Sequence, residues 1–191
     1  MRKYLIIICL GLVSFGSYAQ HNHQSNTDSK TETKDKPAKS LSPHTNAMAM
    51  IGDAHIHIDY SAPSVRNRVI FGGLVGYDTV WQAGAHNATW IMTDKDLDID
   101  GEILPAGKYG FFVIPGKETW EVMLNTRWNQ HGKDEFNKAE NVVSIVLVPE
   151  KLNEIQESLL YDVKKTGENK GVISLAWEKV KIEIPFSVAK H

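Results

Sequence analysis

The chain has 191 residues, and its 23 Asp and Glu against 21 Lys and Arg give a formal net charge of −2. A weakly acidic protein lacks the basic surface that binding to nucleic acid requires, so we expect no nucleic-acid partner. The single cysteine, Cys9, lies near the start of the chain. Loss of that segment would leave no thiol for a disulfide, a nucleophile or a metal site.

Residues 1–19 are predicted to be a secretory signal peptide. Arg2 and Lys3 form a basic start, residues 5–13 are an apolar core, and small residues precede the expected cut after Ala19. An apolar run of nine residues is too short for a membrane span, which takes about 20 residues. We therefore expect a periplasmic or secreted protein with no transmembrane segment after cleavage.

Residues 20–42 contain almost no apolar side chains and are predicted to be a disordered linker. Such a segment cannot bury enough surface to offset the entropy of ordering it. We interpret His21 and His23 in this linker as solvated residues, with metal capture near the new N-terminus as the alternative. The remaining residues, 43–191, have the length of one ordinary domain.

Alternating apolar and polar residues predict that this domain is built from β-strands. In residues 54–60, AHIHIDY, apolar side chains occupy every second position, as in a half-buried strand. Asp100 and Gly101 lie between two short alternating runs and are typical of a two-residue hairpin turn. Three further segments are predicted to be strands, residues 108–114, 120–125 and 142–148.

The C-terminal run 171–188 changes its alternation partway along. Its apolar residues occupy odd positions up to Trp177 and even positions from Val180 onward. A continuous strand cannot make this change, because a shift of one residue turns every later side chain to the other face. We therefore predict a β-bulge or a corner near Glu178 and Lys179.

Helix is scarce in the sequence. Residues 150–161 place leucines and an isoleucine at roughly helical spacing and predict one short helix, and residues 127–138 predict an irregular turn. Strands far outnumber helices, so the expected fold class is all-β. We predict an antiparallel β-sandwich, either jelly-roll-like or a partly closed barrel, with one short helix.

The folded part contains six blocks that carry a family resemblance: YSAPSVRNR (60–68), FGGLV (71–75), WQAGAHNAT (81–89), LPAGKYGFFVIPG (104–116), WEVMLN (120–125) and WEKVKIEIPF (177–186). Together they resemble the bacterial family catalogued as domain of unknown function (DUF) 2911. The resemblance implies an exported envelope domain and no particular activity. The family pattern usually has arginine after the tryptophan and asparagine-glutamate after glycine-alanine, whereas this chain has Gln82, His86 and Asn87.

A ligand-binding site is predicted around residues 71–90. Trp81 offers a flat apolar surface for a sugar ring, and His86 and Asn87 offer hydrogen bonds. We expect Arg68 to bind an anionic or hydroxyl group and Tyr109 to complete the site. The expected function is binding of a small molecule or glycan in the cell envelope. The structural alternative is that Trp81 is a core residue and Asn87 caps a turn.

Two enzymatic alternatives remain open. His55 and His57 would lie on one face of a strand, about 6.5–7 Å apart, and could bind zinc or copper if His86 or His131 supplied a third ligand. Otherwise the pair is the solvent side of that strand.

The second enzymatic alternative is a pair of carboxylates. Glu121 and Glu178 each follow a tryptophan and could hydrolyse a glycosidic bond if they faced one cleft. A different class of protein, an interaction module that pairs through a sheet edge, also fits the pattern. The residues indicate no particular cofactor, and they leave catalysis and the oligomeric state open.

Overall fold

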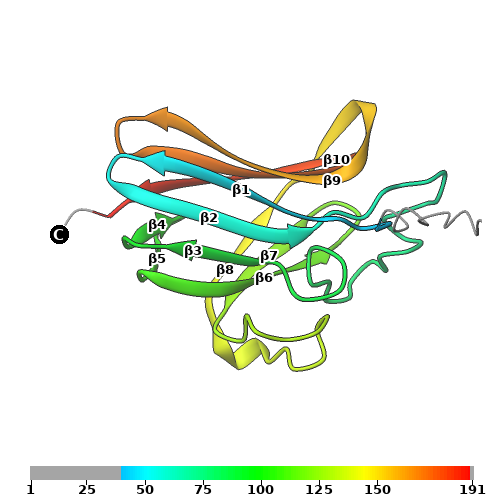
Figure 1. Ribbon diagram of the computed structural model, residues 1–191, viewed down its shortest axis with the longest axis horizontal. Helices are drawn as coiled ribbons and strands as arrows, with labels where there is room; N and C mark the ends of the chain where they lie inside the picture. Colours follow the sequence, from blue (N-terminus) through cyan, green and yellow to red (C-terminus); the bar gives the residue numbers. More distant parts are fainter. Residues whose placement is uncertain (1–39, 190–191) are drawn as a thin grey trace, which may run out of the picture. The chain divides into compact units, whose positions relative to one another are not determined.

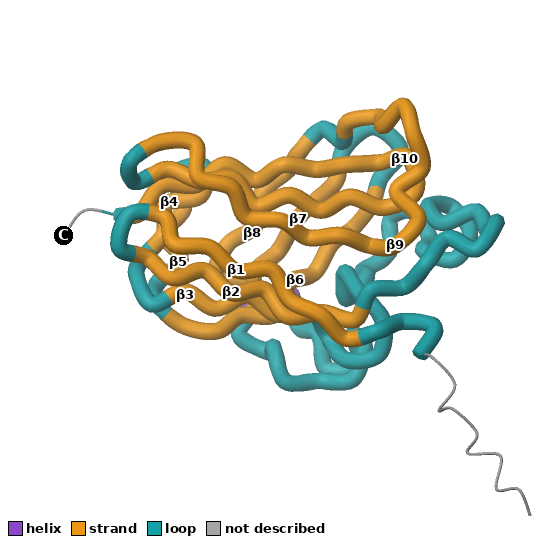
Figure 2. Tube along the Cα trace, turned by 45° about the horizontal axis from the view of Figure 1, so that its top comes forward, coloured by secondary structure: helices purple, strands orange, loops and turns teal. Residues whose placement is uncertain are grey.

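The computed structural model describes residues 40–189, so the predicted signal peptide and nearly all of the predicted linker lie outside the described residues. The described residues form ten strands in two antiparallel sheets, which pack as the layers of a sandwich (Figures 1 and 2). The six-stranded sheet has the order β1 (His44–Ile51), β2 (Ala54–Ser61), β3 (Trp90–Thr93), β6 (Gly107–Pro115), β7 (Trp120–Asn125) and β8 (Asn141–Leu147). The four-stranded sheet has the order β5 (Glu102–Leu104), β4 (Leu97–Ile99), β10 (Lys170–Val188) and β9 (Glu150–Gly167).

The all-β antiparallel sandwich predicted from the sequence is confirmed, but the sheets do not close into a barrel. The period of two predicted for residues 54–60 is seen in β2, where alternate residues such as Ile56 and Ile58 are buried. Each sheet therefore presents an apolar face to the other. Within residues 40–189 there is no helix long and apolar enough to cross a membrane.

Four aromatic side chains occupy the middle of the core. Trp81 stacks on Trp177 with 5.7 Å between ring centroids, and Phe71 contacts Trp120 at 4.6 Å. Phe71 also meets Trp81 and Trp177 edge-on, so the four rings form one continuous cluster. Rings of this size bury a large apolar surface and lock neighbouring elements in place.

The predicted change of phase in the C-terminal strand is confirmed as a β-bulge. The pairing of β10 with β9 shifts register between Ala176 and Glu178 and again between Glu178 and Val180. Glu178 has φ of 55°, in the left-handed region that a non-glycine residue seldom adopts. The bulge absorbs the extra residue, so odd positions before it and even positions after it all face the core.

The predicted hairpin at Asp100 and Gly101 is also confirmed. These two residues join β4 to β5, and both have positive φ values of 54° and 86°. Positive φ at both central residues is what a tight hairpin of type I′ requires, and glycine meets it without strain.

The helix predicted for residues 150–161 is wrong, because this segment is the first part of the long strand β9. Leu159, Tyr161 and Val163 are buried at every second position, and Tyr161 and Val163 pair with Leu175 and Ile173 of β10. Pairing with a neighbouring strand outweighs a local spacing that also suits a helix. The helical element of the described residues is a single 3₁₀ turn, η1 (Lys138–Glu140), beside the predicted irregular turn.

Candidate functional site

The loop between β2 and β3 carries His86 and Asn87 exposed to solvent at the end of the six-stranded sheet where β2 ends (Figure 1). It lies against the loop that follows β7. Asn87 forms an isolated antiparallel bridge with His131, and the Gly132 N–H donates to the His86 carbonyl at 2.8 Å. These backbone contacts hold the positions of the backbone that carries the His86 and Asn87 side chains.

A pocket of about 110 Å³ lies where these two loops meet the sheet, and we call it the loop pocket. Its walls come from the starts of β1 and β3, the end of β2 and both loops. It is lined by His44, Asp59, Tyr60, Ser61, His86, Asn87, Ala88, Trp90, Trp128, Asn129 and Gln130. Polar groups from four separate segments thus face one hollow.

Two adjacent strands supply a hydrogen-bonded pair to the wall of the loop pocket. The His44 ring lies with Nε2 at 2.8 Å from Oδ1 of Asp59. The Asp59 side chain is 19% exposed and the His44 side chain 67% exposed, so the imidazole forms the outer part of the pair. Both groups can exchange hydrogen bonds with a polar ligand.

Two indoles form the apolar part of the same wall. Trp90 and Trp128 meet edge to face with 6.4 Å between centroids. The Lys108 ammonium lies 3.4 Å from the centroid of Trp90 and 3.7 Å from that of Trp128, a cation–π arrangement with both rings. Burial lowers the pKa of Lys108, and the charge of Asp59 acts in the opposite direction. The lysine covers part of each ring, and atoms of both indoles line the loop pocket.

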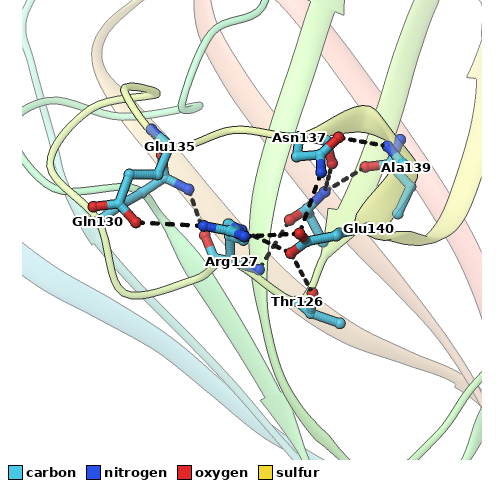
Figure 3. Close-up of polar contacts among 9 residues, drawn as sticks. Thr126, Arg127, Gln130, Glu135, Asn137, Ala139 and Glu140 are labelled. Carbon is cyan, nitrogen blue, oxygen red and sulfur yellow. Dashed lines mark hydrogen bonds and ion pairs between the residues drawn. The ribbon is translucent and has the colours of Figure 1, made fainter.

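A polar network holds the loop after β7 in shape (Figure 3). Arg127 donates from Nε and Nη2 to the two carboxylate oxygens of Glu140, at 2.8 and 2.9 Å. The buried Gln130 side chain donates to the Arg127 carbonyl and accepts from the Glu135 N–H. The network includes Arg127 and Gln130, which lie on either side of Trp128 in the sequence, so it restrains the backbone that carries that indole.

The Arg127–Glu140 pair leads to a prediction about acid stability. Hydrogen bonding from Arg127 holds the pKa of Glu140 below its ordinary value of 4.5. A lowered pKa in the folded state contributes stability above the ordinary pKa, and this contribution is lost as the pH falls through the folded-state pKa. We therefore expect the Tm of the unaltered protein to fall more steeply below pH 4.5 than the Tm of Glu140→Gln.

The measurement is thermal unfolding followed from pH 7 to pH 3. Glu154→Gln is the control, because Glu154 is an exposed carboxylate on β9 that makes no hydrogen bond or ion pair within residues 40–189. Equal acid sensitivity in the Glu140→Gln variant and the unaltered protein would contradict the prediction.

The structure places Trp81 in the core, as the structural alternative had it. Its side chain is 6% exposed, and its Nε1–H donates to the Gly84 carbonyl at 3.1 Å. One part of the ring still lines a second pocket of about 280 Å³, to which His86 also contributes. His86 thus lies between the pocket beside Trp81 and the loop pocket.

Arg68 and Tyr109 line neither of these pockets. The Arg68 guanidinium donates to the carbonyls of Val65 and Ser64 and so closes its own turn. The Tyr109 hydroxyl donates to the Pro105 carbonyl at 3.0 Å, and its ring is buried. Of the five predicted residues, the structure therefore brings only His86 and Asn87 together in the loop pocket.

The three-ligand metal site left open as an alternative is not assembled among the described residues. The rings of His55 and His57 lie 6.3 Å apart on one face of β2, as expected. However, residues 40–189 contain no group of three or more His, Cys, Asp or Glu side chains placed to hold one ion, so neither His86 nor His131 completes the set.

Paired carboxylate catalysis by Glu121 and Glu178 does not fit the structure either. Glu121 lies on β7 and Glu178 on β10, which belong to different sheets. Glu121 contacts Lys138 at 2.9 Å and accepts from the Ser144 hydroxyl at 2.8 Å, and the hydrogen bond from Lys138 lowers its pKa. A general acid needs the opposite shift.

Sequence reasoning missed most of the loop pocket. Trp128 and Asn129 lie in a segment recognised only as an irregular turn, and the pairing of His44 with Asp59 depends on the strand β1, which was not predicted. The strand β1 is an edge strand whose only β-branched residues are Thr45 and Ile51, so it carries little of the β-branched and aromatic signal by which strands are recognised.

A family model described as "Protein of unknown function (DUF2911)" matches residues 42–186. That match spans nearly all of the described residues. No match was found among curated proteins or among solved structures.

Proposed function

The chain belongs to the DUF2911 family, whose description gives no activity, and from the loop pocket we propose that it is an exported protein of the cell envelope that binds a small polyhydroxylated ligand such as the end of a glycan. The sequence of the first 19 residues supports export. The observation that carries the binding proposal is the convergence of two indoles with hydrogen-bonding groups from four segments.

The chemistry of the wall favours a ring that carries hydroxyl groups. Indole surface suits the apolar C–H face of such a ring, while Asn87, Asn129 and Asp59 offer amide and carboxylate groups to its hydroxyls. The volume of about 110 Å³ is well below the roughly 300–1,000 Å³ of pockets for drug-sized ligands. The loop pocket therefore suits a terminal ring or a short end group.

The backbone at His86 supports a functional role for this loop. His86 has φ of 63°, and Ala83 in the same loop has φ of 52°. Non-glycine residues in this region cost on the order of 1 kcal/mol or more each and tend to occur at ligand-binding sites. The strain is retained because the bridge to His131 and the bond from Gly132 hold the loop.

The test is a panel of neutral monosaccharides and short oligosaccharides, including N-acetylglucosamine, read by thermal shift and by calorimetry. We expect at least one sugar to raise the Tm in a saturable way, since a ligand that binds only the folded state stabilises it by about 2.7 kcal/mol at 100 times Kd. Asn87→Ala should weaken the affinity for that sugar by about fivefold, because one net hydrogen bond contributes roughly 1 ± 0.5 kcal/mol and 1.4 kcal/mol corresponds to about tenfold in Kd.

Asn153→Ala is the matched control, since Asn153 is an exposed asparagine on β9 outside the residues that line the loop pocket. Its affinity should equal that of the unaltered protein. No response to any sugar, or equal losses in Asn87→Ala and Asn153→Ala, would refute the proposal.

A further inference from the structure

The outer face of the six-stranded sheet gathers methionine and histidine side chains from three neighbouring strands. Three of the chain's five methionines lie there, together with two histidines. We call this set the Met–His patch: Met48 and Met50 of β1, His55 and His57 of β2, and Met92 of β3.

The strand register places His57 at the centre of the Met–His patch. His57 pairs directly with Met48 on one side and with Met92 on the other, and His55 pairs with Met50. Directly opposed residues of antiparallel strands have Cβ atoms about 4.5–5.5 Å apart and project to the same face. Two thioethers therefore flank the ring of His57.

One nitrogen of this ring has no partner. Nε2 of His57 is buried and makes no hydrogen bond within residues 40–189. The ring packs edge-on against Trp90 at 5.0 Å, and the His55 ring lies 6.3 Å away. A buried polar atom without a partner is destabilising, so it calls for an explanation.

We propose that the Met–His patch binds one Cu(I) ion, with Nε2 of His57 and the thioethers of Met48 and Met92 as ligands. His55 and Met50 lie beside this set and can join it. Thioether sulfur is a soft ligand that selects Cu(I), and imidazole also suits copper. Zinc takes cysteine, histidine and carboxylate ligands, and the described residues offer no such group of three.

The surroundings of the patch favour a monovalent ion. The Lys108 ammonium lies 3.4 Å from the centroid of Trp90, the indole that contacts His57, and β6 places Lys108 directly opposite Met92. Repulsion by this charge doubles for a divalent ion. Access is open, since Met48 is 56% exposed, and flexible methionine side chains can turn toward an ion without moving the strands.

The experiment uses the whole chain, without a histidine tag, in a background carrying Cys9→Ser, His21→Gln, His23→Gln and His191→Gln, so that the cysteine and the histidines outside the described residues are absent. Cu(I) is supplied anaerobically as its acetonitrile complex in competition with bicinchoninate. We expect one Cu(I) per chain, and X-ray absorption should show sulfur ligands, which can only be thioethers in this background. Zinc should not bind to the same site.

The diagnostic variants are Met48→Leu, Met92→Leu and His57→Gln. Each variant should bind Cu(I) at least tenfold more weakly. Loss of a residue that only supports a metal ligand already costs about 10- to 100-fold in affinity, and these three side chains are the ligands themselves. Met123→Leu is the matched control, because it removes the buried thioether of β7, where leucine preserves the volume. Asn87→Ala should also leave Cu(I) binding unchanged, which separates this proposal from ligand binding in the loop pocket.

Three outcomes would overturn the proposal. The background chain could fail to bind Cu(I), its X-ray absorption could show no sulfur ligand, or folded Met48→Leu and Met92→Leu variants could bind Cu(I) as tightly as Met123→Leu does. The X-ray absorption result needs no further substitution in the patch, so it holds even if a variant does not fold.

Discussion

Deletion of Glu178 is expected to prevent formation of the native sandwich. The bulge at this residue lets Trp177 before it and Ile182, Ile184 and Phe186 after it face the same core. Without the extra residue, the last three side chains would turn to the opposite face. Full burial of each contributes about 1.5–3 kcal/mol, so their combined loss is comparable with the roughly 5–15 kcal/mol that stabilises a typical domain.

The measurement is the cooperativity of urea unfolding, with near-ultraviolet circular dichroism as the signal for packed tryptophans. Glu178→Gly is the matched control, because glycine adopts the φ of 55° without strain and keeps the length of the strand. Glycine also removes the carboxylate that accepts from the Ile70 N–H, so we expect the stability of Glu178→Gly to stay within about 1 kcal/mol of that of the unaltered protein. A deletion variant with a native near-ultraviolet spectrum and unchanged cooperativity would contradict the role given to the bulge.

Replacement of Trp177 by alanine is expected to cost about 3–5 kcal/mol, the loss typical of truncating a buried tryptophan. Trp177 is 1% exposed and contacts both Trp81 and Phe71, so alanine would leave a cavity in the centre of the aromatic cluster. The change is read as the difference in free energy of unfolding from urea titration.

A second variant, Trp177→Phe, distinguishes the contribution of ring packing from the effect of the indole N–H. Nε1 of Trp177 is buried without a hydrogen-bond partner within the described part of the chain, so Trp177→Phe removes an unsatisfied donor together with part of the ring. Its cost should be clearly smaller than that of Trp177→Ala. Val148→Ala, at a 75% exposed position, should change stability by less than about 0.5 kcal/mol. Equal losses for alanine and phenylalanine at position 177 would show that packing in the cluster is not what stabilises this region.

Most of the fold could be predicted from the pattern of apolar and polar side chains along each strand. Alternation in residues 54–60 and the turn at Asp100 and Gly101 follow from local chemistry, and the structure has both. The bulge at Glu178 could also be predicted, because two sets of apolar residues with opposite phase can reach one core only if a residue is inserted between them.

The spacing of apolar residues along the chain gave a wrong prediction where pairing with another strand determines the secondary structure. Residues 150–161 suit a helix by their leucine spacing, but five of them pair with β10 across two register shifts, and the pairing continues along the second part of β9. The edge strand β1 gave no clear signal for a related reason. It buries little except Ile51, so its sequence is free of the usual apolar alternation.

The class of fold, the position of the bulge, the family and two residues of the loop pocket, His86 and Asn87, could be predicted from the amino-acid sequence. These are properties of residues that are neighbours along one segment. The burial of Trp81 in the core and the meeting of Trp90 and Trp128 in the pocket wall became evident only from the packing of distant segments. The same is true of the positions of Met48 and Met92 on either side of His57. Such groupings depend on strand register and on the packing of loops from distant segments. Neither can be predicted from the pattern of residues within one segment.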